Sequence, residues 1–327
     1  MARIYSTRSA NILDVDSGPV LLEDDVIWLD LLRPTTEEEQ SYENQLSIEL
    51  PLREELKSIE PSSRLYKDNG ALYMTATVVS KASSGMPEAG PIGFILHGKR
   101  LVTIRYTEPK AFDIFGSYIM RHPHEYEDGA TLLASLLEAI VDRAAEVMEN
   151  VNLEIDALSN DIFAGRTGRP QDMAAGEKLG EALKQIALHQ NLMAKIRDSL
   201  VSLGRVVRFL CLSETIMKNK ALDEQLRSVD RDIASLTDQA SYIGNNITFL
   251  LDASLGLISI EQNAIIKIFS VAAVAFLPPT LVASIYGMNF AHMPELHLKY
   301  GYAFALLAML MSALIPFIYF KRKRWLN

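Results

Sequence analysis

The sequence predicts an α+β/α fold: an N-terminal cytosolic α/β domain, a stalk of long helices and two C-terminal transmembrane helices. Three observations predict this class. Strand-like segments occupy the first third of the chain, apolar residues at helical spacing fill the middle, and two uncharged apolar segments lie near the C-terminus. The 327 residues are 49% hydrophobic, which is high for a soluble protein of this size.

Residues 1–128 are predicted to form the α/β domain. The segments with strand character are VIWLDLL at 26–32, ALYMTATVV at 71–79 and GFILHGKRLVTIRY at 93–106. A hairpin turn is expected at 97–99, inside the third segment. A helix is expected after Pro34, where Thr36 and Glu39 have the spacing of a capping box.

The segment GFILHGKR, Gly93 to Arg100, matches most of a phosphate-binding loop, but Arg100 stands where such a loop carries Ser or Thr. A phosphate loop must also open a helix, whereas this match lies between two strand-like runs. We therefore expect no nucleotide cofactor. The spacing of Ser, His, Cys and Asp residues shows no catalytic set, so we do not expect an enzyme.

Residues 129–262 are predicted to form long cytosolic helices. Apolar residues recur at spacings of three and four, and the pattern breaks at 163–170 and near 220. The third helix has no proline before Pro278, so it is expected to continue from the cytosol into the first membrane segment. A separate helical bundle followed by a linker is the alternative.

Two segments are predicted to span a membrane, 268–286 with 19 uncharged residues and 301–320 with 20. Each covers a hydrocarbon core of about 30 Å at about 1.5 Å per residue. The basic tail, residues 321–327, carries Lys321, Arg322, Lys323 and Arg324, which mark the cytosolic side and place both termini there. The first transmembrane helix is expected at 263–289, followed by an outward-facing loop at 290–300 that contains Glu295. A buried helical hairpin in a soluble core is the alternative.

Charge is divided unevenly along the chain. The last 65 residues hold six Lys or Arg and one acid, which leaves 26 basic and 40 acidic residues in 1–262. This acidic part suits cations and argues against nucleic acid as a partner. The single cysteine, Cys211, and the absence of an N-terminal apolar segment both indicate a cytosolic domain. Two transmembrane helices cannot enclose a pore, so conduction requires a homo-oligomer in the bilayer.

Four residues recur every seven positions along the first membrane segment and define what we call the stripe: Asn263, Ser270, Leu277 and Ser284, with Thr280 one turn before the last. All of these except Leu277 are polar. Such a stripe serves either a pore or a helix–helix contact.

Asp252 lies in a mostly apolar stretch, where a carboxylate is costly unless it lines water or meets a cation. Acids on the third helix, among them Asp230 and Asp232, are the ligand type that hard divalent ions prefer, although a solvated face also explains them.

The segment YGMNF at 286–290, followed by MPEL at 293–296, a second apolar span and the tail KRKRWLN, resembles the CorA family of magnesium transporters. The segment FLPPT at 276–280 is similar to the proline-containing stretch of that family. VIWLDLLRPTTEEE and IEPSSRLY resemble its N-terminal domain, so the resemblance covers nearly the whole chain.

The resemblance implies a funnel-shaped homopentamer in the cell (inner) membrane. It implies an outer ion-binding ring of Gly287, Met288 and Asn289, with Gly287 allowing the left-handed backbone that often ends a helix. The residues that would line the pore are Asn263, Phe269, Leu277, Thr280 and Ser284. Asp252 matches an acidic position at the cytosolic mouth. For the regulatory magnesium sites the nearest match is Ser228, with Asp230 and Asp232 close by.

The function expected from this resemblance is potential-driven influx of hydrated Mg²⁺, and also of Co²⁺ or Ni²⁺, gated by cytosolic Mg²⁺. A zinc-transporting branch shares the Gly-Met-Asn signature but tends to continue with a glycine-rich stretch, which FAHMPEL is not. A membrane-anchored metal sensor or scaffold that conducts nothing also fits the topology. Both remain alternatives.

Overall fold

The computed structural model describes residues 2–6, 13–15, 19–58, 60, 64–122, 124–164, 173–288, 293–294 and 298–322. The chain divides into two compact units. We call them the N-terminal unit, Met1–Leu251, and the C-terminal unit, Asp252–Asn327.

The N-terminal unit is built on a seven-stranded sheet with the order β2-β1-β3-β7-β6-β5-β4. The strands are β1 Ala2–Ser6, β2 Leu13–Val15, β3 Val26–Leu32, β4 Leu65–Asp68, β5 Ala71–Ser80, β6 Glu88–His97 and β7 Arg100–Arg105. The pair β3 and β7 is parallel, and the other neighbours are antiparallel. All seven residues of β3 are buried, as expected for a strand covered on both faces.

The strands predicted at 26–32 and 71–79 are confirmed as β3 and β5. The segment 93–106 forms most of the hairpin β6–β7, and the turn contains Gly98 with φ +59°. Glycine adopts this left-handed backbone without a Cβ penalty, which explains its place in the turn. The segment that resembles a phosphate loop is therefore a β-hairpin and opens no helix.

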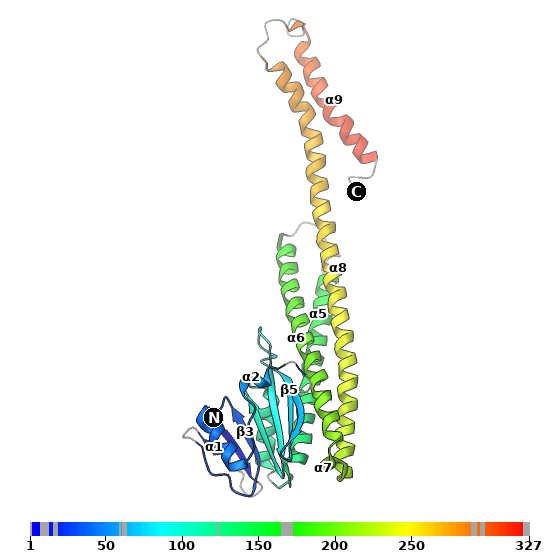
Figure 1. Cartoon of the computed structure of the whole chain (residues 1–327). Coiled ribbons are helices and arrows are strands. Elements are labelled where there is room, and N and C mark those ends of the chain that lie inside the picture. The colour runs from blue at the N-terminus through cyan, green and yellow to red at the C-terminus, as the bar shows by residue number, and fades with distance from the viewer. Residues whose placement is uncertain are drawn as a thin grey trace. The chain divides into compact units, whose positions relative to one another are not determined.

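One face of the sheet is covered by α1, Thr36–Leu46, and α2, Arg53–Leu56, as Figure 1 shows. Tyr42, Leu46 and Leu56 from these helices join the buried core against the strands. The capping box at the start of α1 differs from the prediction by one residue. It consists of Thr35 and Glu38, because the chain becomes helical at Thr36.

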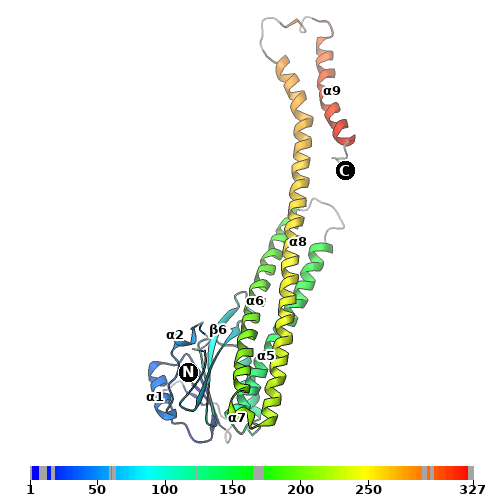
Figure 2. The same ribbon diagram turned by 45° about the vertical axis from the view of Figure 1, so that its right-hand side comes forward.

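The opposite face is covered by α4, Lys110–Arg121, and by two long helices, α5, Gly129–Ala164, and α6, Met173–Cys211. In Figure 2 the two long helices run beside each other along the sheet. The short helix α7, Glu214–Met217, follows α6. The unit is thus a sheet between two helical layers, and both layers bury their apolar sides on it.

The helix α8, Lys220–Tyr286, is continuous over 67 residues and crosses from the N-terminal into the C-terminal unit. Its buried residues in the N-terminal unit follow the three-and-four spacing of a helix face: Leu222, Leu226, Val229, Ile233, Ala240, Ile243, Ile247 and Leu250. The prediction of an unbroken third helix is confirmed. The domain boundaries at 128 and 262 stay predictions.

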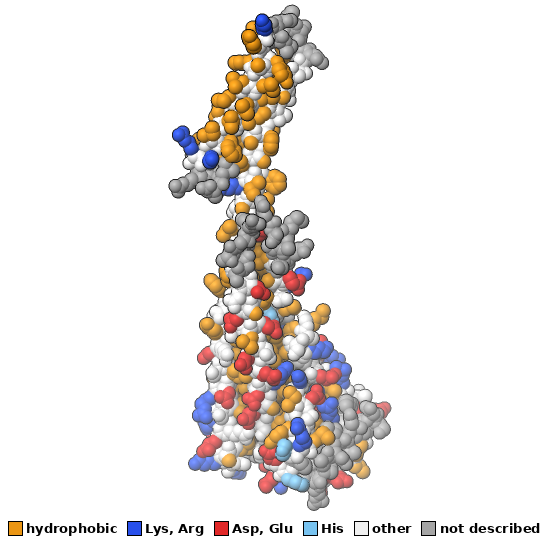
Figure 3. All heavy atoms as spheres, turned by 180° about the vertical axis from the view of Figure 1, so that it is seen from behind, with side chains coloured by type: hydrophobic (Ala, Val, Ile, Leu, Met, Phe, Trp, Pro, Cys, Tyr) orange, Lys and Arg blue, Asp and Glu red, His pale blue; other side chains and the backbone are white. Residues whose placement is uncertain are grey.

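The C-terminal unit contains the end of α8 and α9, Gly301–Arg322. Both helices are long and apolar enough to cross a membrane. In the most apolar stretch of α8 no residue is buried in the chain, and in that of α9 6% are. Figure 3 shows hydrophobic side chains over the visible face of this unit, with Lys and Arg side chains at its ends. A soluble core helix would be covered, so these uncovered helices indicate a lipid or protein environment.

Candidate functional site

The stripe lies on α8 in the C-terminal unit. Residues seven positions apart on a helix differ by only about 20° in direction, so Asn263, Ser270, Leu277 and Ser284 follow one line. Asp252 precedes Asn263 by eleven positions, about three turns, and lies near the same line. From Asp252 to Ser284 this line extends about 48 Å at about 1.5 Å per residue.

Two of the predicted pore residues lie off this line. Thr280 is about 40° from Ser284, close enough for both to face one channel. Phe269 is about 80° from Leu277, so the two residues proposed as a hydrophobic constriction point in clearly different directions on a straight helix. All five predicted pore residues on α8 are exposed, because this part of the chain has no covering element among the described residues.

Two hydroxyl groups on this side of α8 bond back to the helix. Ser270 Oγ donates to the carbonyl of Ile266 at 2.8 Å, and Thr280 Oγ1 donates to that of Phe276 at 2.7 Å. Their hydrogens are thus engaged, while the oxygen lone pairs remain free to accept. Such oxygens suit a ligand that donates hydrogen bonds, as the water shell of a cation does.

Pro278 and Pro279 lie inside α8, as predicted from the uninterrupted helix. Proline has no N–H. The carbonyls of Val274 and Ala275 therefore lack the hydrogen bonds that the N–H groups of residues 278 and 279 would donate in an ordinary helix. Val274 lies about 20° from the direction of Asn263 and therefore on the stripe side of the helix. The backbone here adds acceptor character to the same side of α8.

The end of α8 differs from the expectation in one respect. Gly287 N donates to Ala283 O at 2.9 Å and Met288 N donates to Ile285 O at 3.3 Å, so the helical turn extends through both residues. Gly287 does not have the left-handed backbone suggested by its type, since the glycines with positive φ among the described residues are Gly70 and Gly98. A Cβ at Gly287 would instead lie 3.2 Å from Ala283 O, a tight contact.

Four predicted residues lie outside the described part of the chain: Asn289, Glu295, Lys323 and Arg324. Lys321 and Arg322 form the last turn of α9. Cations at that end complement the partial negative charge of the helix C-terminus.

The acids proposed for regulation lie on α8 in the N-terminal unit. Asp230 accepts a hydrogen bond from Arg208 Nε of α6 at 3.0 Å. Asp232 is exposed, and its charge acts on one acid of α5, Asp142. Burial, followed by the charges of Glu138 and Asp232, raises the pKa of the Asp142 carboxyl. Among the described residues of one chain, no three His, Cys, Asp or Glu side chains are placed to hold a metal ion.

Sequence reasoning missed a polar group in the core of the N-terminal unit. Asp30 and Arg105, both 1% exposed, form a two-point ion pair with distances of 2.8 and 2.9 Å. Thr103 Oγ1 donates to the same carboxylate at 2.8 Å, and Trp28 Nε1 donates to Thr103. The only signal in the sequence was a charged residue inside each of two apolar strands.

An α/β unit continued by one long helix into two uncovered, membrane-length helices defines a class: a membrane protein with a large domain at one side of the bilayer. Small polar groups on one side of the first membrane helix suit a pore or a helix–helix contact within that class. A profile of the CorA-like Mg²⁺ transporter protein family matches residues 23–322. The chain belongs to this family.

Relatives with known names are similar in sequence over nearly the whole chain. The magnesium transport protein CorA of Haemophilus influenzae is 35% identical over 330 residues, covering 100% of both chains. That of Salmonella typhimurium is 35% identical over 318 residues, covering 96% of both.

Solved structures share the fold. The CorA magnesium transporter from Methanocaldococcus jannaschii matches with a TM-score of 0.72 at 20% identity, covering 99% of this chain and 98% of that one. The full-length CmaX protein matches with a TM-score of 0.66 at 15% identity, covering 99% and 97%. The cytoplasmic domain of ZntB from Vibrio parahaemolyticus matches with a TM-score of 0.55 at 11% identity, covering 79% and 99%. At these identities the structures support the fold alone.

Proposed function

We propose that the chain forms a homopentameric channel that conducts Mg²⁺ into the cell, with α8 lining the pore and both termini in the cytosol. One observation carries the proposal. On one side of α8 lie Asp252, Asn263, Ser270 and Ser284, and the most apolar stretch of this helix is long enough to cross a membrane and is uncovered in the chain. Family membership and the names of the full-length relatives support Mg²⁺ as the ion.

The outer mouth is assigned to Gly287, Met288 and Asn289. Mg²⁺ gives up its waters reluctantly, so a selective mouth should recognise the hydrated ion rather than strip it. An asparagine offers a carbonyl oxygen that accepts hydrogen bonds from those waters without a formal charge. The C-terminal end of α8 adds partial negative charge beside it. A ring of neutral acceptors attracts the ion and still lets it leave.

Below the mouth the hydrated ion would pass Ser284, Thr280 and Asn263 and leave near Asp252. Ser270 and Thr280 have engaged hydrogens and free oxygen lone pairs, which fits waters that donate to them. Inward movement needs no ATP, since a divalent ion gains about 4.6 kcal/mol per 100 mV of inside-negative potential, at about 2.3 per charge.

The gate is assigned to cytosolic Mg²⁺ bound between neighbouring N-terminal units. Asp230 and Asp232 are the proposed ligands from α8, and acids of an adjacent copy would complete the site. Bound Mg²⁺ then favours the closed state, and its loss releases the subunits. Co²⁺ and Ni²⁺ are proposed as further transported ions.

The mouth is tested with Asn289→Ala. We expect at least a tenfold loss of Mg²⁺ influx into dye-loaded proteoliposomes, because removing the amide from every subunit removes the whole ring of acceptors. Gln239→Ala, which removes an exposed amide of α8 within the N-terminal unit, far along the helix from the mouth, is the control and should leave influx unchanged. Size-exclusion chromatography must show the same assembly for both. Normal influx in Asn289→Ala would refute the assignment.

Two other functions are separated by the same assay. A zinc transporter would carry Zn²⁺ in preference to Mg²⁺ across a series with Co²⁺ and Ni²⁺. A metal sensor or scaffold would carry none of them while still binding Mg²⁺.

A further inference from the structure

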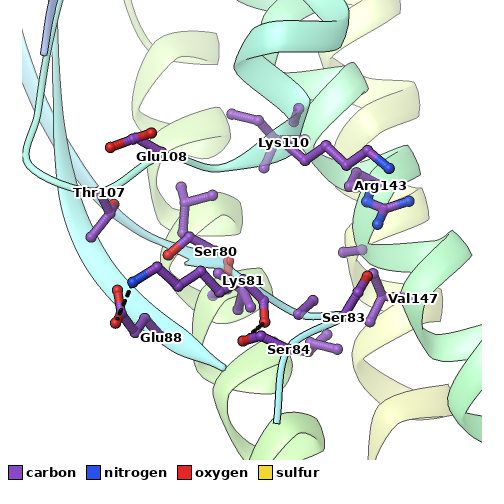
Figure 4. A pocket seen from close by; sticks show the side chains of 18 of the residues that line it. Ser80, Lys81, Ser83, Ser84, Glu88, Thr107, Glu108, Lys110, Arg143 and Val147 are labelled. Atoms are coloured by element: carbon purple, nitrogen blue, oxygen red, sulfur yellow. Dashed lines mark hydrogen bonds and ion pairs between the residues drawn. The ribbon is translucent and has the colours of Figure 1, made fainter. Parts of the chain in front are cut away.

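The N-terminal unit contains a cavity of about 680 Å³ that the proposed function does not use. Its walls are the end of β5 with the loop that follows, the start of α4, and the facing sides of α5 and α6 (Figure 4). Val78, Ile140 and Val147 supply apolar surface, while Ser80 and Lys110 are among the polar groups. A volume of this size is in the usual range of small-molecule sites, about 300–1,000 Å³.

The acids that line the cavity are already engaged. Each is in an ion pair of 2.8 Å: Glu88 with Lys81, Glu108 with Arg33, and Asp113 with Arg3. Lys110, which also lines the cavity, forms no ion pair among the described residues. The cavity therefore has a positive charge that the lining acids do not neutralise.

A second cation lies beside this lysine. In Figure 4 the side chain of Lys110 extends along the upper wall toward Arg143 of α5, whereas Lys81 points away toward Glu88. The hydrogen bond from Arg143, together with the positive charge of Lys110, lowers the pKa of the exposed Glu146 carboxyl. Both cations thus act on the same carboxyl group, and both line the cavity.

The start of α4 adds backbone N–H donors at the same wall. Its N-cap residue is Pro109, which makes no side-chain capping bond, and the helix extends for 12 residues. The first N–H groups of a helix have no partner within the helix, and its dipole favours an anion there. Lys110 and Ala111, the first two residues of α4, line the cavity.

Ser80 is a second, independent feature of this cavity. The residue is 2% exposed and its Oγ has no hydrogen-bond partner among the described residues. Thr107 Oγ1, in another residue that lines the cavity, also has none among the described residues. Buried hydroxyls are nearly always bonded, so two unpartnered ones beside a cationic cavity indicate that a polar group occupies it.

We propose that this cavity binds the phosphoryl group of a small phosphorylated molecule. The phosphoryl oxygens accept from Lys110 Nζ, from the first N–H groups of α4 and from Ser80 Oγ, and the rest of the molecule lies on Val78, Ile140 and Val147.

A phosphoryl group fits this donor set better than a carboxylate. It presents three strong acceptor oxygens at tetrahedral angles, and the donors here come from a helix start, a side-chain ammonium and a strand hydroxyl. The uncapped start of a helix of this length is a common phosphate-binding element. The remaining volume exceeds that of inorganic phosphate and is bounded by apolar side chains, which points to an organic ester.

The test uses the full-length chain in detergent, without Mg²⁺, so that its outcome is independent of ion transport. Isothermal titration with inorganic phosphate and with AMP should show saturable binding at one site per chain. If AMP binds more tightly than inorganic phosphate, the apolar wall contacts the organic part of a phosphate ester. If the two bind with equal affinity, the site takes free phosphate. Failure of both probes to bind would overturn the proposal.

Variants test which residues bind. Lys110→Gln should weaken phosphoryl binding about tenfold, because it removes a charge-assisted contact. Lys220→Gln is the matched control, since Lys220 is also an exposed first residue of a helix, and it should bind as the unmodified chain does. Equal binding by the Lys110 and Lys220 variants would place any phosphate elsewhere and refute the site.

Ser80→Ala separates a ligand role from a structural one. The hydroxyl has no hydrogen-bond partner among the described residues, so its removal should leave the thermal midpoint unchanged or raise it, while phosphoryl affinity falls about fivefold. A lowered midpoint with unchanged affinity would show that the hydroxyl serves folding alone.

Discussion

Asp30 and Arg105 form a buried ion pair at the centre of the sheet. They lie on the parallel neighbours β3 and β7, and both are almost fully buried. A buried charge without a partner is costly, whereas the pair itself can be close to neutral in its net contribution. The local structure therefore tolerates both charges or neither.

Arg105→Met should lower the free energy of unfolding by about 3–5 kcal/mol, because it leaves the Asp30 carboxylate buried and unpaired. Arg33→Met is the control, since the pair Arg33–Glu108 has the same 2.8 Å separation but is more than half exposed on both sides. Its loss should cost at most about 1 kcal/mol. Thermal unfolding of the purified full chain compares the two, and equal effects would contradict the buried-pair argument.

Asp232 offers the cleaner test of regulation. Asp230 is bonded to Arg208, so replacing it also frees an arginine, whereas Asp232 is exposed and has no such bond among the described contacts. Asp232→Asn should shift inhibition by internal Mg²⁺ to severalfold higher concentration, because each subunit loses one anionic ligand. Asp238→Asn, another exposed acid of α8, should leave the inhibition curve in place. Identical curves for all three proteins would count against this region.

At the scale of elements, the start of α5 is fixed by close approach to the hairpin β6–β7. Gly129 N donates to Lys99 O at 2.7 Å, and Asp128 accepts from Thr131 N at 2.8 Å, which caps the helix. A Cβ at Gly129 would lie 2.4 Å from Leu101 N and 2.6 Å from Arg100 C. Both are backbone atoms, so only a shift of α5 away from β7 relieves the contact.

Gly129→Ala should therefore destabilise the N-terminal unit by about 1–3 kcal/mol, the usual cost of overpacking. Gly180→Ala is the matched control. Gly180 lies inside α6 with nothing within 4 Å of an added Cβ, and there alanine should add about 0.5–1 kcal/mol of stability through its higher helix propensity. Thermal unfolding distinguishes the expected loss of stability in Gly129→Ala from the expected gain in Gly180→Ala. If both substitutions stabilise the protein, the start of α5 is not fixed by this contact.

At the scale of the whole molecule, the proposed topology places the N-terminal unit and the C-terminus in the cytosol and the loop before α9 outside. The chain has one cysteine, Cys211, which is partly buried, and burial raises the pKa of its thiol. A Cys211→Ser chain is therefore a convenient background for new labelling sites.

In that background, Lys299→Cys should react with a membrane-impermeant maleimide on intact spheroplasts, because the position is exposed and predicted to face outward. Met217→Cys, 69% exposed in the N-terminal unit, should react only after permeabilisation. Labelling of Met217→Cys on intact spheroplasts would reverse the proposed orientation.

The fold was predictable where the pattern is local. The strands at 26–32 and 71–79 and the unbroken α8 follow from apolar spacing and from the position of proline. The helix α4 was missed although Phe112, Phe115 and Ile119 have helical spacing and are buried, and β1 was missed because five residues give little periodicity. The capping box was placed one residue late, since Thr35 and Thr36 are both followed by glutamate three positions on.

The sequence by itself determined the two membrane-length segments, the continuous helix that enters the first of them, the polar stripe and the family resemblance, because each depends on residues near one another along the chain. Only the tertiary structure decided that Asp30 and Arg105 meet, that Gly129 has no room for a side chain, and that Ser80 and Lys110 share a cavity. Those contacts join residues about 30 to 75 positions apart, and such pairing is set by how the sheet and helices pack rather than by any local spacing.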